Sequence, residues 1–213
     1  MSLPTGILTF CFTDVEGSSE LWERQSDAMA RALVWHDRLV ANTIESHGGH
    51  LILSMGEGDS TVSVFAKATD AVTAAVSLQR ALLHNSQNEL GLAVRIGLHT
   101  GPAEQRDGTY FGSTVNLAAR VRSLADGGHV FLSSATRQAL GASLPAGCAI
   151  ADLGVHSLRG FSAGEAIYAV TADGLKAPPS TECPYQGLRA YGRDDGDRFF
   201  GRDQTVAEAV QTL

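Results

Sequence analysis

The stretch TFCFTDVEGSS, residues 9–19, decides how the chain is interpreted. Its apolar part predicts a β-strand over residues 7–12, which leads directly to the carboxylate of Asp14. A turn of small residues, Gly17-Ser18-Ser19, comes next, and we expect Ser18 or Ser19 to cap the helix that follows. Backbone N–H groups at such a helix start can hold phosphate oxygens.

Two further segments carry side chains that are suited to binding phosphate groups or the metal ions that accompany them. The turn GEGDS, residues 56–60, places Asp59 after a short apolar run, and the segment NLAAR places Asn116 and Arg120 four residues apart. On a helix, residues four apart share one face. Two carboxylates can hold Mg²⁺ on a polyphosphate, and an Asn–Arg pair can stabilise charge that develops on phosphorus. Each aspartate alone would be read as a turn residue, but together the segments predict phosphoryl chemistry on a nucleoside triphosphate.

Composition limits the alternatives. The 213 residues are 44% apolar and 18% charged, which is typical of a globular core, and the net charge of −7 gives no basic surface for nucleic acid. The three cysteines are widely spaced and predict neither a metal cluster nor a disulfide framework. No apolar run approaches the roughly 18 residues of a membrane span, and the N-terminus does not resemble a signal peptide. We therefore expect a cytoplasmic segment that contacts neither membrane nor nucleic acid.

Periodicity predicts an α/β (α+β) fold, with helices packed against a sheet. The segment 18–46 is either one helix or two helices with a break near residues 25–27. The other expected elements are a hairpin of strands 50–54 and 60–65, a helix over 67–83, a strand over 92–99 that ends at Thr100-Gly101-Pro102, a loop over 105–109, a helix over 115–124, a strand over 130–132, a helix over 134–140 capped by Ser134, and strands over 149–153, 156–158 and 166–170.

Composition changes at Leu175. The segment APPST, residues 177–181, is typical of a linker, and the aromatic-containing segment after it does not complete a core of its own. We expect a catalytic domain over residues 1–174, a linker over 175–183, and the start of a following domain over 184–213.

Four segments at compatible spacings carry a family resemblance. FTDVEGSS, GEGDS, VRIGLHTGP (94–102) and YFGSTVNLAARV (110–121) together resemble the catalytic domain of class III adenylyl and guanylyl cyclases, over residues 5 to about 172. The resemblance implies a ferredoxin-like βαββαβ core with extra strands and helices. It also implies a head-to-tail homodimer with active sites at the interface, and conversion of ATP or GTP to the 3′,5′-cyclic nucleotide and pyrophosphate.

The resemblance assigns roles to individual residues. Asp14, the Val15 carbonyl and Asp59 match the ligands of two Mg²⁺ or Mn²⁺ ions, and Asn116 and Arg120 match the pair that acts in the transition state. The phosphate-binding group comprises Gly17, Ser18, Ser19, Arg95 and, by a looser alignment, Arg159.

The positions that select the base depart from the family pattern. Met55 stands where adenylyl cyclases carry Lys, and Thr109 stands where they carry Asp. Neither matches the Glu and Cys of guanylyl cyclases, unless Glu57 takes the first role. We therefore expect relaxed selection, with ATP as substrate and GTP as a second one.

The tail PYQGLRAYGRDDGDRFFGRDQTVAEAV, residues 184–210, resembles the entry segment of STAND-type signalling ATPases. This resemblance implies that ATPase or regulatory domains are attached in the parent protein.

Three functions are compatible with these patterns. The favoured one is an active nucleotidyl cyclase, and the alternative is a cyclase-like dimerisation or nucleotide-sensing module with weak or no activity, which Met55 and Thr109 support. A diguanylate-cyclase-like enzyme would need a GG[DE]EF turn, which GEGDS does not supply.

Overall fold

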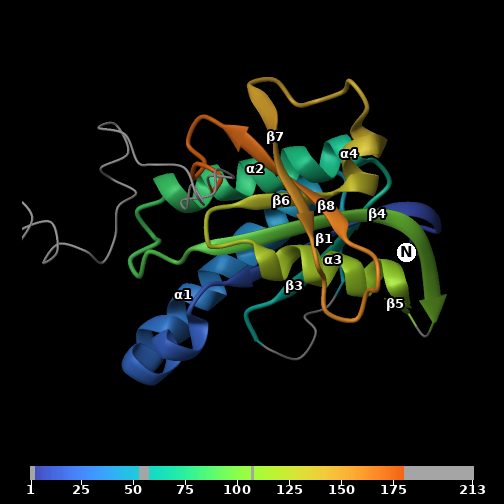
Figure 1. Ribbon diagram of the computed structural model, residues 1–213. Coiled ribbons are helices and arrows are strands. Elements are labelled where there is room, and N and C mark those ends of the chain that lie inside the picture. Colours follow the sequence, from blue (N-terminus) through green and yellow to red (C-terminus); the bar gives the residue numbers. More distant parts are fainter. Residues whose placement is uncertain (1–2, 53–57, 107, 180–213) are drawn as a thin grey trace, which may run out of the picture. The chain divides into compact units, whose positions relative to one another are not determined.

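A computed structural model describes residues 3–52, 58–106 and 108–179 of the chain (Figure 1). Within them eight strands and four helices follow one another: β1 (Gly6–Val15), α1 (Ser18–Ser46), β2 (His50–Ile52), β3 (Thr61–Phe65), α2 (Ala68–His84), β4 (Val94–Arg106), β5 (Thr109–Phe111), α3 (Ser113–Leu124), β6 (Val130–Ser133), α4 (Ser134–Leu140), β7 (Cys148–His156) and β8 (Glu165–Ala172). The α+β fold class is confirmed.

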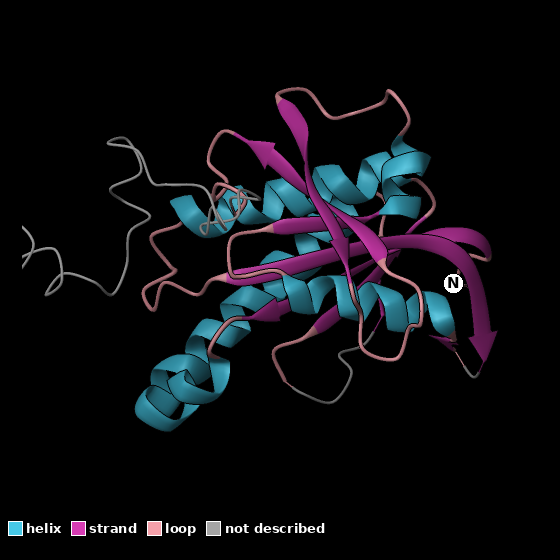
Figure 2. Cartoon of the chain, viewed as in Figure 1, coloured by secondary structure: helices cyan, strands magenta, loops and turns pink. Residues whose placement is uncertain are grey.

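The strands form a single sheet in the order β2-β3-β1-β4-β6-β8-β7, and β5 pairs with β4 beside this path (Figure 2). Neighbouring strands are antiparallel except β4 and β6, which are parallel. The part β2-β3-β1-β4, with α1 and α2 as its connections, is the ferredoxin-like βαββαβ core expected from the sequence. The remaining strands extend the sheet beyond β4.

Helices cover both faces of the sheet. Helices α1 and α2 pack on one face, and α3 lies across the other (Figure 1). Alternate residues of β1 contribute to the two layers: Cys11 and Val15 pack with the α1 and α2 side, and Phe10 and Phe12 pack with the α3 side. Burial on both faces explains why the strand reads as a continuous apolar run.

Strand β4 continues past the turn-like residues at which the sequence predicted its end. It pairs with β1 from Val15↔Val94 to Gly6↔Ala103, so pairing with the central strand carries it through Gly101 and Pro102. It then turns back on β5, and the predicted loop over 105–109 is wrong, because Gln105 and Arg106 already belong to this hairpin.

Two predicted helix caps are also wrong. Gly17, with φ of 67°, caps α1, and its carbonyl accepts hydrogen bonds from the N–H groups of Glu20 and Leu21. This left-handed conformation suits glycine, and Ser18 and Ser19 become the first helical residues. At α4 the cap is Ser133, whose Oγ accepts a hydrogen bond from Thr136 N at 3.2 Å, so the predicted cap Ser134 lies inside the helix.

The structure also defines the break in α1 and the end of β7. Helix α1 is interrupted at Gln25, where φ is −145° and ψ is 52°, so the predicted break exists as a kink between two helical stretches. Strand β7 runs continuously to His156 with an irregularity between Asp152 and Val155, so the separate strand predicted over 156–158 is wrong.

None of the helices in the described part of the chain is long and apolar enough to cross a bilayer. The compact unit that contains the sheet ends at Pro178. The predicted domain boundaries remain predictions, and the segment with the ATPase resemblance lies outside the described residues.

Candidate active site

Asp14 lies near the end of β1, between two neighbouring strands. The register places it directly opposite Arg95 on β4, while the preceding residue, Thr13, pairs with Thr61 on β3. Asp14 is only 6% exposed. Nε and Nη2 of Arg95 both lie near Asp14 Oδ2, each at 2.5 Å. The backbone register of two adjacent strands therefore fixes this ion pair.

Arg122 reaches the same carboxylate from helix α3. Its Nη1 lies 2.9 Å from Asp14 Oδ1 and donates to Ser60 Oγ at 3.0 Å, and Ser60 Oγ in turn donates a hydrogen bond to Asp14 Oδ1. We call Asp14, Arg95, Arg122 and Ser60 the Asp14 cluster. Burying a lone carboxylate would be costly, and the two guanidinium groups compensate its charge.

Close packing of α3 against β4 sets the position of Arg122. A Cβ at Gly97 would lie 2.2 Å from the backbone nitrogen of Arg122, so the helix contacts the strand only because this residue is glycine. Gly97 lies two residues along β4 from Arg95, on the same face of the sheet. The side chain of Arg122 spans this short separation to reach Asp14.

Asp59 supplies the second buried carboxylate. It directly precedes Ser60 of the Asp14 cluster and is also 6% exposed. Its Oδ2 is buried and has no hydrogen-bond partner among the described residues. An unpartnered carboxylate oxygen on the residue that precedes Ser60 of the Asp14 cluster fits a divalent cation, because Mg²⁺ and Mn²⁺ prefer oxygen ligands. The described residues contain no group of three His, Cys, Asp or Glu side chains that could hold an ion, so a metal would rest on the two aspartates and backbone oxygens.

Asn116 and Arg120 do not join these carboxylates within one chain. Both side chains are exposed on α3, whereas Val115, Ala118 and Val121 form its buried face. In the described part of the chain neither side chain makes a hydrogen bond or ion pair. The predicted transition-state pair therefore points away from the sheet that carries Asp14.

The other predicted metal and phosphate ligands are not part of the Asp14 cluster. Residues 17–19, the N-cap and first residues of α1, follow β1 after Glu16 and are largely exposed, close in sequence to Asp14. The Val15 side chain is buried in the core, which leaves only its backbone for a ligand. Arg159 is exposed in the connection between β7 and β8, and no described contact links it to the Asp14 cluster.

Of the two predicted base-selecting positions, the structure describes one. Thr109 is half-buried at the start of β5 and lines a cavity of about 10 Å³ with Ile52, Val62, Tyr110 and Val115. Such a volume is close to that of a single water position and cannot hold a purine. Met55 lies outside the described residues.

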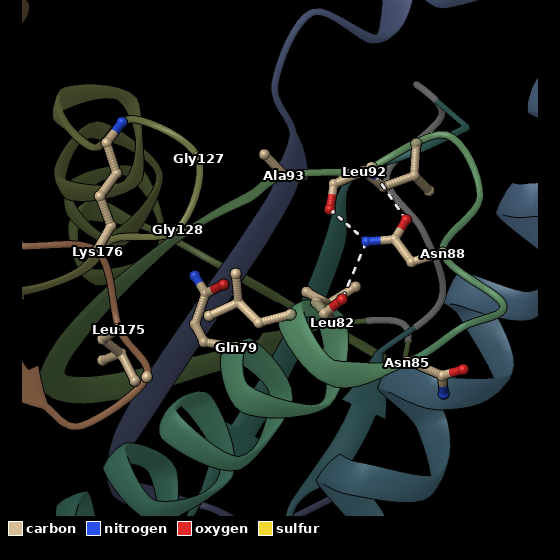
Figure 3. A pocket seen from close by; sticks show the side chains of 13 residues that line it. Gln79, Leu82, Asn85, Asn88, Leu92, Ala93, Gly127, Gly128, Leu175 and Lys176 are labelled. Carbon is tan, nitrogen blue, oxygen red and sulfur yellow. Dashed lines mark hydrogen bonds between the residues drawn. The ribbon is translucent and has the colours of Figure 1, made fainter.

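A much larger cavity of about 610 Å³ lies elsewhere, between α2, the start of β4 and residues 174–176 (Figure 3). Asn88 shapes one wall, because its side-chain amide donates to the carbonyls of Leu82 and Leu92. None of the predicted site residues lines it.

Sequence reasoning missed Arg122 and Ser60. A signal for Arg122 was present, since it lies four and seven residues after the buried Ala118 and Val115 and so falls on the sheet-facing side of α3. A charge on that face needs a partner.

Comparison with known proteins places this geometry in a family. Residues 2–171 match the family described as the adenylate and guanylate cyclase catalytic domain, and the chain belongs to it. It is 43% identical over 158 residues to an uncharacterized protein of Mycobacterium tuberculosis (strain ATCC 25618 / H37Rv), a match that covers 74% of this chain and 53% of that protein. An adenylate cyclase of Podospora anserina is 32% identical over 157 residues, which cover 62% of this chain and 7% of the fungal protein. The chain thus spans about half the length of the mycobacterial relative.

Solved structures agree with this assignment. Adenylate cyclases from Trypanosoma brucei, determined in their monomeric state, match with a TM-score of 0.73 and 27% identity, over 84% of this chain and 94% of theirs. The adenylyl cyclase CyaB from P. aeruginosa matches with a TM-score of 0.70 over 80% of this chain and 96% of its own. At 23% identity the second match speaks for the fold alone.

Proposed function

We propose that the chain is a nucleotidyl cyclase that converts ATP, and GTP as a second substrate, to the 3′,5′-cyclic nucleotide and pyrophosphate. The observation that carries this proposal is the pair of buried carboxylates, Asp14 and Asp59, one of them with an unpartnered oxygen, in a chain of the cyclase family. Membership of the family alone would fit an inactive relative equally well.

The two carboxylates and the Val15 carbonyl are the groups we expect to hold Mg²⁺ or Mn²⁺, as two ions per site. When bound, these ions would supply the charge that acidifies the ribose 3′-hydroxyl and offsets the phosphate oxygens. The N–H groups at residues 17–19 begin a helix, and a helix N-terminus favours anions. Arg95 and Arg159 supply further positive charge toward the departing pyrophosphate.

Asn116 and Arg120 act, in this proposal, on a nucleotide held by a second copy of the chain. Their exposure on the outer face of α3 supports such a role, because groups that face solvent in one chain are available to a partner. Asn116 would orient the ribose, and Arg120 would stabilise negative charge on the α-phosphate. The active species is then a homodimer with composite sites.

Met55 and Thr109 are the proposed base-selecting positions. A methionine side chain cannot donate a hydrogen bond to adenine, and a threonine reaches less far than the aspartate of the family pattern. Loss of one such hydrogen bond typically costs about 1–3 kcal/mol. We therefore expect modest discrimination between ATP and GTP.

The test is cyclic nucleotide formation from each nucleotide with Mg²⁺ or Mn²⁺. Asp59→Ala and Arg120→Ala should each reduce product to background, and an equimolar mixture should recover part of the activity, because one heterodimer site keeps both groups. Arg24→Gln, which alters an exposed ion pair on α1, is the matched control and should remain fully active. Failure of the mixture to recover, with both variants folded, would exclude the composite site.

One observation favours a second function. Both oxygens of Asp14 are already engaged by guanidinium groups, which suits a nucleotide-sensing dimerisation module that performs no chemistry. Absence of product from both nucleotides, in the full parent protein as well, would favour this alternative.

A cytoplasmic location and attached ATPase domains beyond residue 183 complete the proposal.

A further inference from the structure

Arg122 forms an ion pair with Asp14, the carboxylate that the proposed function assigns to metal. Its Nη1 lies 2.9 Å from Asp14 Oδ1, the same oxygen that accepts the hydrogen bond from Ser60. Arg95 engages the other oxygen, Oδ2. A cation that approaches Asp14 therefore meets two positive side chains before it meets a free oxygen.

We propose that Arg122 is an exchangeable cation that blocks Asp14 in the absence of nucleotide and moves to the triphosphate when metal and nucleotide bind together. The inference rests on the proposed function for the identity of the ligand, and it concerns Arg122, which the family resemblance did not assign. It makes metal binding and triphosphate binding mutually dependent.

The contacts of the two arginines explain why Arg122, and not Arg95, would exchange. Arg95 is the direct cross-strand partner of Asp14, and two of its nitrogens contact the carboxylate. Arg122 comes from a separate layer and is held through one terminal nitrogen. Its Nε is buried with no hydrogen-bond partner among the described residues, so the protein leaves this donor unsatisfied.

An unsatisfied guanidinium donor points to an anionic ligand. Arginine presents several donors in a planar fork that matches phosphate oxygens. The side chain is 18% exposed, so part of it is accessible from solvent. Phosphate oxygens would satisfy the donors that Asp14 and Ser60 do not reach.

Charge balance gives the same conclusion. Asp14 and Asp59 contribute two negative charges, and Arg95 and Arg122 contribute two positive charges, so the four side chains sum to zero. A divalent ion alone adds positive charge to a neutral, largely buried site, which is unfavourable. A nucleoside triphosphate that arrives with the two proposed ions offsets their positive charge and provides Arg122 with a new partner.

The experiment measures Mn²⁺ binding directly, from the electron paramagnetic resonance signal of free Mn²⁺, without turnover. In Arg122→Gln, Mn²⁺ alone should bind about tenfold more tightly than in the wild type, since an adjacent charge shifts ionic equilibria at a carboxylate by about tenfold or more. Arg122→Lys keeps the positive charge and should retain weak binding. Arg24→Gln, which removes an exposed arginine, is the control and should bind Mn²⁺ as the wild type does. Asp14→Asn should bind Mn²⁺ more weakly than Arg122→Gln does.

A second titration includes the non-hydrolysable probe α,β-methylene-ATP. The wild type should bind Mn²⁺ markedly more tightly with the probe than without it, and Arg122→Gln should lose about tenfold of this enhancement, the effect of one charge-assisted contact. Thermal unfolding verifies that each variant folds. If Arg122→Gln is unstable, Arg122→Met provides the same neutral test with the apolar stem retained.

The outcomes separate this inference from the proposed function. Tighter Mn²⁺ binding in Arg122→Gln, together with no cyclic product from the wild type, would support the exchange and contradict the proposed cyclase activity. Cyclic product from the wild type, together with an unchanged Mn²⁺ affinity in Arg122→Gln, would support the proposed activity and overturn the exchange. Equal Mn²⁺ binding to Asp14→Asn and the wild type in the presence of α,β-methylene-ATP would also overturn it, because the ion would then lie elsewhere.

Discussion

Burial controls the chemistry of Cys11 in the central strand. The thiol is 1% exposed, and this burial raises its pKa from 9.0 to about 12, although a hydrogen bond with Ser63 acts in the opposite direction. The folded protein thus keeps this proton at pH values at which the unfolded chain releases it. Proton binding then links the stability of the fold to pH.

The sign of this dependence can be predicted. Below pH 9 both states hold the proton, and between pH 9 and about 12 only the folded state does, so the free energy of unfolding falls as pH rises. Where the unfolded chain has fully released this proton, the contribution of Cys11 approaches about 1 kcal/mol per pH unit. Urea unfolding at pH 8, 9 and 10 measures it, and Cys11→Ala should show a shallower decline. Equal slopes in both proteins would contradict the assignment to this thiol.

The residues of the site differ in how far the sequence could reveal them. Asp14 and Asp59 stand out because each lies at the boundary between an apolar run and a turn. Arg122 carries no comparable local mark, and only the buried pattern of α3 indicates its inward direction. Its partner comes from a strand more than a hundred residues earlier, and such a long-range pairing follows from the packing of α3 on β4, the strand next to β1.

At the scale of elements, the packing of α3 on β4 depends on Gly97. An added Cβ would lie 2.2 Å from the backbone nitrogen of Arg122 and 2.4 Å from its Cα, and helix backbone cannot yield as a flexible side chain does. Gly97→Ala should therefore displace α3 and destabilise the fold by about 1–3 kcal/mol, the usual cost of overpacking. Because α3 carries Asn116, Arg120 and Arg122, product formation should fall as well.

Thermal unfolding and the cyclase assay together test this prediction. Gly154→Ala is the control: Gly154 has φ of 79° and no neighbour within 4 Å of an added Cβ, so the change strains the backbone without displacing a helix. Both variants should lose stability, but only Gly97→Ala should lose activity. A fully active Gly97→Ala would show that the position of α3 is not critical.

Elements were predicted better at their centres than at their ends. Apolar periodicity located the four helices of the described residues and the central strands, since these patterns reflect burial against the sheet. The ends of β4 and β7 could not be predicted, because pairing with β1, β5 and β8 carries the chain through residues that locally favour turns. The cap at Gly17 replaced the expected serines for a similar reason, since the exit from β1 requires a left-handed residue.

At the scale of the whole molecule, the two halves of the candidate chemistry face different directions. The carboxylates of Asp14, in β1, and Asp59, just before β3, are buried, while Asn116 and Arg120 are exposed on the outer side of α3. Side chains on opposite sides of a packed helix cannot reach one substrate without large rearrangement. A second copy of the chain can bring both sets to one nucleotide.

This division predicts how activity depends on protein concentration. If only the dimer is complete, cyclic nucleotide formed per milligram of protein should rise with concentration and level off once most chains are paired. The measurement is specific activity over a thousandfold dilution series, with sedimentation equilibrium on the same samples to give the dimer fraction. Asp59→Ala at each concentration corrects for contaminating activity. The two curves should rise together, because dimer formation assembles the site. Constant specific activity across a range in which the chains dissociate would mean that one chain contains every group the reaction needs, and Asn116 and Arg120 would then lose their assigned role.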